Sequence, residues 1–553
     1  MQDGEIRLEG HIVDLVNRKI TDGELCVRNG NIYSITPKAL AKENLPYIMP
    51  GFVDSHIHIE SSMLLPSNFA EVAVRFGTVG VVCDPHEIAN VLGKEGIEFM
   101  IEDGKNVNFH FYNGAPSCVP ATSFETSGES LNSKDVASLL KNDDIFLLSE
   151  MMNYPGVLFK DEEVMKKIST ANKYNKVIDG HAPGLMGENL KTYASQGIST
   201  DHECSTIEEA QEKIKCGMNI LIREGSAAKN FKALILLMKQ NPEKLMFCSD
   251  DKHPDDLILG HINLLVKRAI EEGYDVFDVL RSASLNPKQH YKLSTGLLQE
   301  GDNADFILVD NLQEFNILST FINGKEVFNK EEGIRKDNFV KSLQGNYYPN
   351  NFHANPITQK DIEIQAKGEN IRVIECFDGE IFTKETIAKA KIENDKVVSD
   401  VDNDILKIVV MDRYTGNKSQ TAFIKGFGFK QGAIASSVAH DSHNVIAIGV
   451  SDEEIVRAMN MVIENEGGIS IVCKEKTDIL HLPIAGLISE MKAPLVAKKY
   501  KELNQTAKTL SNKLQAPYMT LSFMALLVIP ELKLSDKGLF DGKNFQFTQL
   551  FVS

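Results

Sequence analysis

The sequence of 553 residues contains no tryptophan, no Cys-x-x-Cys pair and no uninterrupted run of about 18 apolar residues. The missing apolar run excludes a membrane-spanning helix, and the polar start MQDGEIRLEG lacks the apolar segment of a signal peptide. The eight cysteines are widely spaced, and a chain of this length does not need disulfides to fold. We therefore expect reduced thiols and a soluble, cytoplasmic protein.

Basic residues are also in deficit. The 59 Lys and Arg residues stand against 77 Asp and Glu residues, which leaves a formal net charge of −18. This balance disfavours nonspecific binding to nucleic acid or to an anionic membrane, so a small-molecule ligand is the expected partner. With 42% hydrophobic and 25% charged residues the chain is globular, and its length suits two to four domains of roughly 150 residues.

The chain divides into three predicted parts. Residues 1–46 and 297–345 show short alternating strands and are expected to form one small discontinuous β-sandwich domain. Between 47 and 296 an apolar run followed by an amphipathic helical segment recurs eight times, which is typical of a (β/α)8 TIM barrel. A polar linker rich in Asn, Pro and Tyr precedes a predicted C-terminal α/β domain at 357–553.

Ionisable residues gather at the carboxyl ends of the eight predicted strands, where a barrel of this kind builds its active site. The strongest local signal is His56-Ile57-His58, because residues two apart in an extended segment project from the same side and can reach one metal ion. Four further candidate ligands end the fourth, fifth, sixth and eighth predicted strands: Glu150, His181, His202 and Asp250.

Any one of these six side chains taken alone is explained as an ordinary polar loop residue, but their shared position at strand ends is not. Four His with one Glu and one Asp form a mixed nitrogen and oxygen ligand set, which suits zinc, iron(II) or manganese better than copper(I) or calcium. If Glu150 bridges two ions, a water held between them has a lowered pKa and acts as hydroxide.

Asp250 and Asp251 are adjacent carboxylates that point to opposite sides if the segment is extended. We expect Asp250 to ligate the metal and take the proton of the water, and Asp251 to bind a ring nitrogen of the substrate or to solvate the loop. Asp54, two residues before His56, is a candidate hydrogen-bond partner behind the ligands or a loop cap.

Four further positions have more than one explanation each. Asp84, His86 and Glu87, in the segment CDPHE, are candidate substrate contacts or hydrogen-bond partners behind the ligands, while Asp84 could instead cap the helix that follows. Arg223 ends the seventh predicted strand, where it either contacts the substrate or pairs with Glu224.

Several segments around these residues resemble the amidohydrolase superfamily and, more closely, the bacterial adenine deaminase family: MPGFVDSHIHIESSM, DPHEIANVLG, DGHAPGL, STDHE and CSDD. Two C-terminal segments are similar to that family's own C-terminal domain: GFGFKQGAIASSVAHDSHNVIAIG and LHLPIAGLISE. The resemblance implies a hydrolase of C–N bonds in cyclic amidines that converts adenine to hypoxanthine and ammonia in purine salvage. It also implies two divalent metal ions, manganese or iron(II), with zinc as a further candidate, and a homodimer.

Carried over by position, the resemblance places the metal ligands on the same six residues and makes Asp250 and Glu150 the catalytic pair. A metal-activated hydroxide would attack C6 of adenine, and Asp250 would accept the proton of the water. The family pattern adds candidate contacts to the purine and candidate caps of its pocket at Asp84, Glu87, His440 and His443.

Two alternatives compete with this interpretation. Hydantoinase-like and dihydroorotase-like relatives carry a carboxylated lysine where this chain has Glu150. This difference weakens the case for a cyclic-amide substrate, but another purine-like heterocycle stays possible as the substrate. A metal-free relative that kept only the barrel is the other alternative, and the intact set of six candidate ligands argues against it.

Overall fold

The computed structural model describes residues 5–39, 45–339, 347–416, 419–474, 476–511 and 513–552. The chain forms two compact units. The first holds Met1–Pro85, Glu98–Ser117 and Asn132–Gly345, and the second holds His86–Ile97, Cys118–Leu131 and Asn346–Ser553. The second unit therefore includes two short pieces of the predicted barrel region. The three-part domain layout stays a prediction, and its limit at 345 lies outside the described residues.

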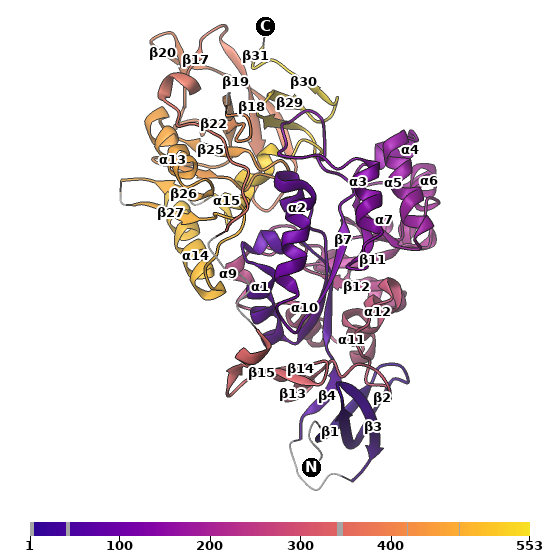
Figure 1. The fold of residues 1–553 in the computed structure, drawn as a ribbon. Coiled ribbons are helices and arrows are strands. Elements are labelled where there is room, and N and C mark those ends of the chain that lie inside the picture. The colour runs from indigo at the N-terminus through magenta and orange to yellow at the C-terminus, as the bar shows by residue number, and fades with distance from the viewer. Residues whose placement is uncertain are drawn as a thin grey trace. The chain divides into compact units, whose positions relative to one another are not determined.

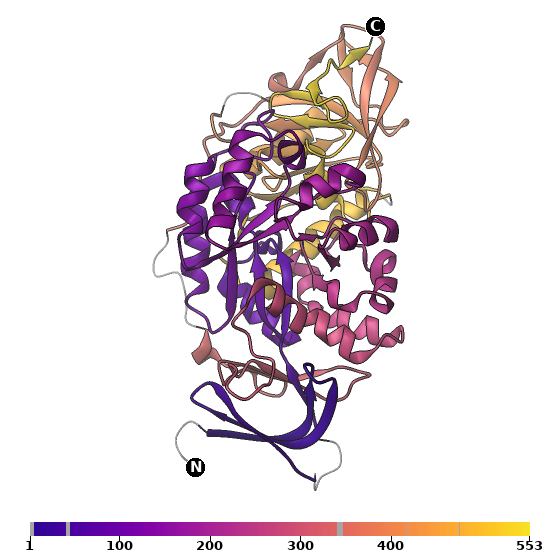
Figure 2. The same ribbon diagram turned by 90° about the vertical axis from the view of Figure 1, so that its right-hand side faces the viewer.

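In the first unit, strands from both sides of the central region share one sheet in the order β16-β15-β14-β13-β4-β1-β2-β3. β1 pairs antiparallel with β2 and parallel with β4, and β4 pairs antiparallel with β13. Figure 2 shows the indigo N-terminal strands as a curved sheet. The strands are β1 (Glu5–Asp14), β2 (Lys19–Arg28), β3 (Asn31–Pro37), β4 (Tyr47–Pro50), β13 (Phe306–Val309), β14 (Ile317–Ile322), β15 (Lys325–Asn329) and β16 (Gly333–Ile334).

All eight strands predicted between 47 and 250 are present. β5 to β9 form a five-stranded parallel sheet, and β10, β11 and β12 form a three-stranded parallel sheet. Isolated parallel bridges join Ile178 to Ile198 and Ile57 to Asp250. The strands are β5 (Phe52–Ile57), β6 (Thr78–Cys83), β7 (His110–Ala115), β8 (Ile145–Met151), β9 (Val177–Gly180), β10 (Thr200–Asp201), β11 (Asn219–Arg223) and β12 (Leu245–Cys248).

One apolar cluster collects side chains from most of these parallel strands. Its members include a residue from each of β5, β6, β7, β8, β9, β11 and β12: Val53, Val82, Tyr112, Leu147, Val177, Leu221 and Met246. The strands are apolar runs because a parallel strand covered by helices is buried on both faces. The fold is therefore mixed α/β, with parallel strands around a shared core.

Helices between the parallel strands carry apolar residues at three-to-four spacing, and several of them begin at a side-chain cap. The side chain of Asp161 caps α5, and that of Thr206 caps α7. Figure 1 shows α3, α5 and α7 along the parallel strands. The helices are α1 (Pro66–Ala73), α3 (Ser133–Leu140), α4 (Tyr154–Leu158), α5 (Glu162–Lys173), α6 (Gly187–Ala194), α7 (Ile207–Lys215), α8 (Phe231–Leu234), α9 (Pro254–Leu257), α10 (Ile262–Glu271), α11 (Val276–Ala283) and α12 (Leu285–Tyr291).

The second unit is built on a nine-stranded sheet in the order β19-β18-β23-β22-β25-β24-β26-β27, with β31 beside β18. Helix α13 (Asp452–Glu464) covers β24, β25 and β26 through a buried apolar cluster. The strands are β18 (Asn370–Cys376), β19 (Thr383–Lys389), β22 (Leu406–Met411), β23 (Ser419–Lys425), β24 (Ala433–Ser436), β25 (Val445–Gly449), β26 (Gly468–Val472), β27 (Thr477–His481) and β31 (Phe551–Val552).

Smaller elements complete the second unit. Two three-stranded sheets contain β17 (Ile364–Gln365), β20 (Lys391–Glu393) and β21 (Lys396–Val398), and β28 (Leu532–Ser535), β29 (Gly538–Asp541) and β30 (Gln546–Phe547). The other helices are α14 (Ala493–Leu510) and α15 (Pro517–Ser522). Helix α2 (His86–Gly104) begins in the second unit and has non-helical backbone angles at Gly93.

The piece 118–131 is anchored within the second unit by polar contacts. Asp536 accepts hydrogen bonds from the backbone N–H of Thr126 at 2.9 Å and from its hydroxyl at 2.6 Å. The side chain of Asn444 donates to the carbonyl of Thr126 at 2.8 Å. This piece is therefore structurally part of the C-terminal region.

Among the described residues, no helix has both the length and the apolar character needed to cross a bilayer.

The core of the first sheet depends on Phe306, which is fully buried and stacks on Phe321 with ring centroids 4.5 Å apart. Phe306→Ala should lower the free energy of unfolding by about 3–5 kcal/mol, because it leaves a cavity. Urea denaturation followed by circular dichroism measures the change. Phe159→Ala, at a side chain that is 86% exposed, is the control and should shift stability by less than about 0.5 kcal/mol. Equal losses in both variants would contradict this role.

Candidate metal centre

The six candidate ligands predicted from the sequence meet in the first unit. They lie in or just after β5, β8, β9, β10 and β12, at the carboxyl ends of parallel strands. Five are buried, and the side chain of His181 is 16% exposed. The six residues are His56, His58, Glu150, His181, His202 and Asp250.

Glu150 lies between two pairs of histidines. Its Oε1 is 3.3 Å from Nε2 of His58 and 3.9 Å from Nε2 of His56. Its Oε2 is 2.7 Å from Nδ1 of His181 and 3.2 Å from Nε2 of His202. Each oxygen of one carboxylate therefore faces a different pair of imidazoles, as a bridging ligand requires.

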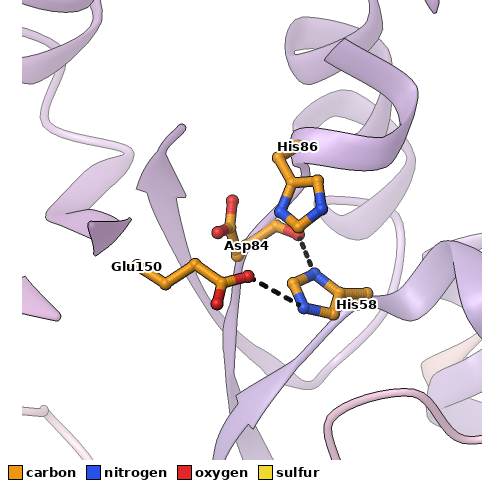
Figure 3. A group of neighbouring side chains, drawn as sticks. All are labelled: His58, Asp84, His86 and Glu150. Atoms are coloured by element: carbon orange, nitrogen blue, oxygen red, sulfur yellow. Dashed lines mark hydrogen bonds and ion pairs between the residues drawn. The ribbon is translucent and has the colours of Figure 1, made fainter. Parts of the chain in front are cut away.

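The ring of His58 is oriented from behind. Its Nδ1 lies 2.9 Å from the backbone carbonyl of Asp84, which can only accept a hydrogen bond, so Nδ1 carries the proton. Figure 3 shows this contact and the opposite edge of the ring turned toward Glu150. The figure also draws His86, two residues after Asp84 in the chain. Once Nε2 has lost its proton, as binding a metal ion requires, its lone pair faces the cluster.

Asp250 joins the same cluster with a backbone conformation that the sequence does not predict. Its φ of 54° is left-handed, so the expectation of an extended segment here is wrong. Oδ1 of Asp250 lies 3.2 Å from Nε2 of His58 and 3.7 Å from Nε2 of His56. The neighbouring Asp251 instead accepts a hydrogen bond from the hydroxyl of Ser61 at 2.5 Å.

Arg223 pairs with the carboxylates of Asp250 and Glu203, and not with that of its neighbour Glu224. Its Nη1 donates to Oδ2 of Asp250 at 2.5 Å, and both Nη atoms contact the carboxylate of Glu203. The expected pair of Arg223 with Glu224 is wrong, because adjacent residues of a strand point to opposite faces. Glu224 lies 3.7 Å from Arg268 instead.

Glu203 is a residue of this cluster that the analysis of the sequence missed. Its Oε1 is 3.4 Å from Nε2 of His202 and 3.7 Å from Nδ1 of His181. Glu203 follows His202 directly in the motif STDHE. A carboxylate next to a candidate ligand at a strand end is the sequence feature that could have identified it.

Asp54 supports the ligands from behind rather than capping an exposed loop. Its Oδ1 accepts the backbone N–H groups of His56 at 3.3 Å and of Ser249 at 3.0 Å. Its Oδ2 accepts the Ser249 hydroxyl and lies 2.8 Å from Nε2 of the buried His261. One carboxylate thus links the backbones of β5 and of the segment before Asp250.

Burial and charge shift the histidines in opposite directions. Burial, aided by the charge of His202, lowers the pKa of His56 well below its ordinary value. Burial would also lower the pKa of His58, but hydrogen bonds to Asp250 and Glu150 outweigh it and raise this pKa well above the ordinary value.

Both central carboxylates stay ionised despite their burial. Burial would raise the pKa of Glu150, but its contacts with the histidines, His181 first, hold this pKa well below the ordinary value. Burial opposes the same shift in Asp250, where the guanidinium of Arg223 contributes most to lowering the pKa. The cluster therefore places two buried negative charges among four imidazole rings.

The donor atoms converge closely enough to hold divalent cations. In each of three overlapping groups, one nitrogen or oxygen per residue lies within 4.8 Å of the others: His56, His58 and Asp250; His56, Glu150 and His202; His181, His202 and Glu203. Imidazole and carboxylate donors of this number suit zinc, manganese or iron(II). The residues present therefore fit a centre of one or two such ions.

Two of the predicted substrate contacts, Glu87 and His443, belong to the second unit. Nδ1 of His440 is 2.6 Å from Oε1 of Glu87, and Nε2 of His443 contacts Oε2. Burial lowers the pKa of His443 to about 4, so its ring is neutral near pH 7 and donates through Nε2. In the same segment, the capping role considered for Asp84 is wrong, because the N-cap position of α2 is Pro85.

Comparison with known proteins identifies the family. Residues 47–327 match the model of the amidohydrolase family, and residues 380–546 match that of the adenine deaminase C-terminal domain. The adenine deaminase of Parabacteroides distasonis is 48% identical over 99% of this chain and 98% of its own. Those of Salinibacter ruber and Methanosarcina mazei are each 50% identical, over 99% and 98% of this chain and 99% of their own. The chain belongs to the amidohydrolase family and, within it, to the adenine deaminases.

Proposed function

We propose that this protein is an adenine deaminase, a hydrolase of C–N bonds that converts adenine and one water to hypoxanthine and one ammonia. Relatives of that name, about half identical over nearly the whole chain, support the reaction. The structural observation that carries the proposal is Glu150, whose two carboxylate oxygens each face a separate histidine pair.

The proposed metal ligands are the six residues that meet at the strand ends: His56, His58, Glu150, His181, His202 and Asp250. These residues would hold two divalent ions, manganese or iron(II), with zinc as a further candidate, since this donor set accepts each of them. When bound, the ions supply a water of lowered pKa and polarise the group under attack.

Asp250 and Glu150 are the proposed catalytic pair, and Asp250 is the proposed proton carrier. Arg223 holds Oδ2 and keeps the carboxylate ionised, which leaves Oδ1 on the side of His56 and His58 to accept the proton of the water. The same oxygen then returns a proton toward the departing ammonia.

Substrate contacts are proposed at five residues. Asp251, which accepts a hydrogen bond from the hydroxyl of Ser61 close to Asp250, is proposed to bind a ring nitrogen. Both Nη atoms of Arg223 are engaged by carboxylates, but its buried Nε–H has no hydrogen-bond partner among the described residues and would serve the substrate. The five residues are Asp84, Glu87, Arg223, Asp251 and His443.

Closure of the parallel strands into a complete (β/α)8 barrel is part of the same proposal. The parallel bridges Ile178 to Ile198 and Ile57 to Asp250, together with the shared core of seven strands, support it. We further propose a cytoplasmic homodimer that works in purine salvage.

The proposed activity is tested by loading purified protein with manganese, or anaerobically with iron(II), and measuring ammonia and hypoxanthine formed from adenine. We expect one ammonia per hypoxanthine and no release in a chelated sample, because the water is activated by the ions. Metal binding without release would direct the search to other purine-like heterocycles, and failure to bind metal would contradict the proposed centre.

Glu150→Gln should reduce metal content and turnover together, turnover by orders of magnitude, because the bridging charge serves both ions. Inductively coupled plasma mass spectrometry and the ammonia assay measure the two effects. Glu162→Gln, at a carboxylate that is 82% exposed on α5, is the control and should leave both unchanged. Normal metal content with full activity in Glu150→Gln would remove this residue from the centre.

Asp250→Asn and Asp251→Asn form a matched pair of variants that distinguishes the roles proposed for the two adjacent carboxylates. Asp250→Asn should lower kcat by about 10²–10⁴-fold, the usual cost of losing an acid–base group, and should weaken metal binding. Asp251→Asn should mainly raise KM and leave metal content at the wild-type level. The reverse pattern would exchange the two roles.

A further inference from the structure

Beside the strands that present His181 and His202, three charged side chains form a buried group that the proposed reaction does not use. Lys213 and Glu209 come from α7, and Asp201 comes from β10. Lys213 and Asp201 are fully buried, and Glu209 is 3% exposed. None of the three was singled out by its sequence pattern.

The ammonium of Lys213 has three N–H donors, and three acceptor oxygens surround it. Nζ lies 2.7 Å from Oε1 of Glu209, 3.1 Å from Oδ2 of Asp201 and 2.7 Å from the carbonyl of Ala182. The third acceptor belongs to the residue that follows His181. The lysine is therefore fully satisfied and is tied directly to the backbone next to a candidate ligand.

The two carboxylates bind the backbone at matching positions after the two histidines. Asp201 accepts the N–H groups of Ala182 at 2.9 Å and Glu203 at 2.8 Å, each one residue after a histidine. Glu209 accepts those of Gly184 at 2.8 Å and Ser205 at 3.2 Å, each three residues after a histidine. All four carboxylate oxygens of this group are thus used to join the two loops.

We propose that Lys213, Asp201 and Glu209 are positioning residues that fix His181 and His202 relative to each other, and with them the binding site of one metal ion. The inference rests on the proposed metal centre. His181 and His202 share a donor group with Glu203, His56 and His58 share another with Asp250, and a third joins His56, Glu150 and His202. The four backbone contacts of this network lie after His181 and His202, so it serves the side of the centre that these two ligands form.

A purely stabilising role explains these contacts less well. A buried ion pair is often replaced by apolar residues without loss of stability, because the cost of desolvating the charges offsets their attraction. The contacts of this group are instead directional, and its carboxylates reach the backbone of both ligand loops. A network of this kind holds geometry, which is what a metal site with two ligands on separate strands requires.

The test is Lys213→Met, measured by manganese binding rather than by turnover. Wild-type protein should bind two ions per chain. The variant should keep one ion at wild-type affinity and bind the other about 10–100-fold more weakly, the usual cost of losing a residue that orients metal ligands. The visible spectrum of the cobalt-loaded protein should change in the variant, because the geometry of one site is altered.

Lys407→Met is the matched control. Lys407 is also a buried lysine, 1% exposed, paired with Asp452 and 3.2 Å from the carbonyl of Ile362, but it lies in the second unit. This variant should lose stability while binding two ions at wild-type affinity. An equal loss of metal affinity in both variants would assign the effect to general destabilisation and overturn the positioning role.

Glu209→Gln keeps the test decisive if Lys213→Met does not fold. An amide has one acceptor oxygen where the carboxylate has two, so either Gly184 or Ser205 loses its partner, and the affinity for one ion should fall while the other is unchanged. Two ions at wild-type affinity in this variant would overturn the inference. A wild-type protein that binds no metal would overturn the proposed centre itself, which separates the two failures.

Discussion

The central constraint on this protein is the convergence of buried carboxylates and imidazoles around Glu150. Charged groups taken out of water cost several kcal/mol each unless opposite charges or metal ions compensate them. The parallel strands solve the geometric part of this problem, because their carboxyl ends bring ligands that are distant in sequence to one place. The hydrogen bonds of Asp54 and of the Lys213 group then act on the backbone beside those ligands.

Much of this arrangement is encoded in patterns that a single sequence displays. The eight parallel strands follow from apolar runs bounded by polar residues, and the six candidate ligands follow from their position at the strand ends. The H-x-H spacing of His56 and His58 alone does not predict a metal site. The set is identified by the agreement of several strand ends, each of which contributes one side chain able to bind a metal ion.

The residues that the sequence did not reveal share a physical reason. Lys213 and Glu209 lie in the helical segment IEEAQEKIK, where charged residues normally face solvent, and their burial depends on loops from other strands. Glu203 and the true partners of Arg223 depend on tertiary contacts between β10, β11 and the segment after β12. The left-handed backbone of Asp250 is likewise imposed by its surroundings, since Asp adopts that conformation without requiring it.

The composition of the second unit has a consequence for how the protein is made. Its pieces His86–Ile97 and Cys118–Leu131 leave the ribosome long before Asn346–Ser553, which supplies the rest of that unit, including Asp536 and Asn444. Domains generally fold as units as the chain emerges, but this one cannot be completed until its last and longest piece has been synthesised. The early pieces must wait in a nascent chain whose first strands are already able to pair, so the order of synthesis and the order of folding differ in this protein.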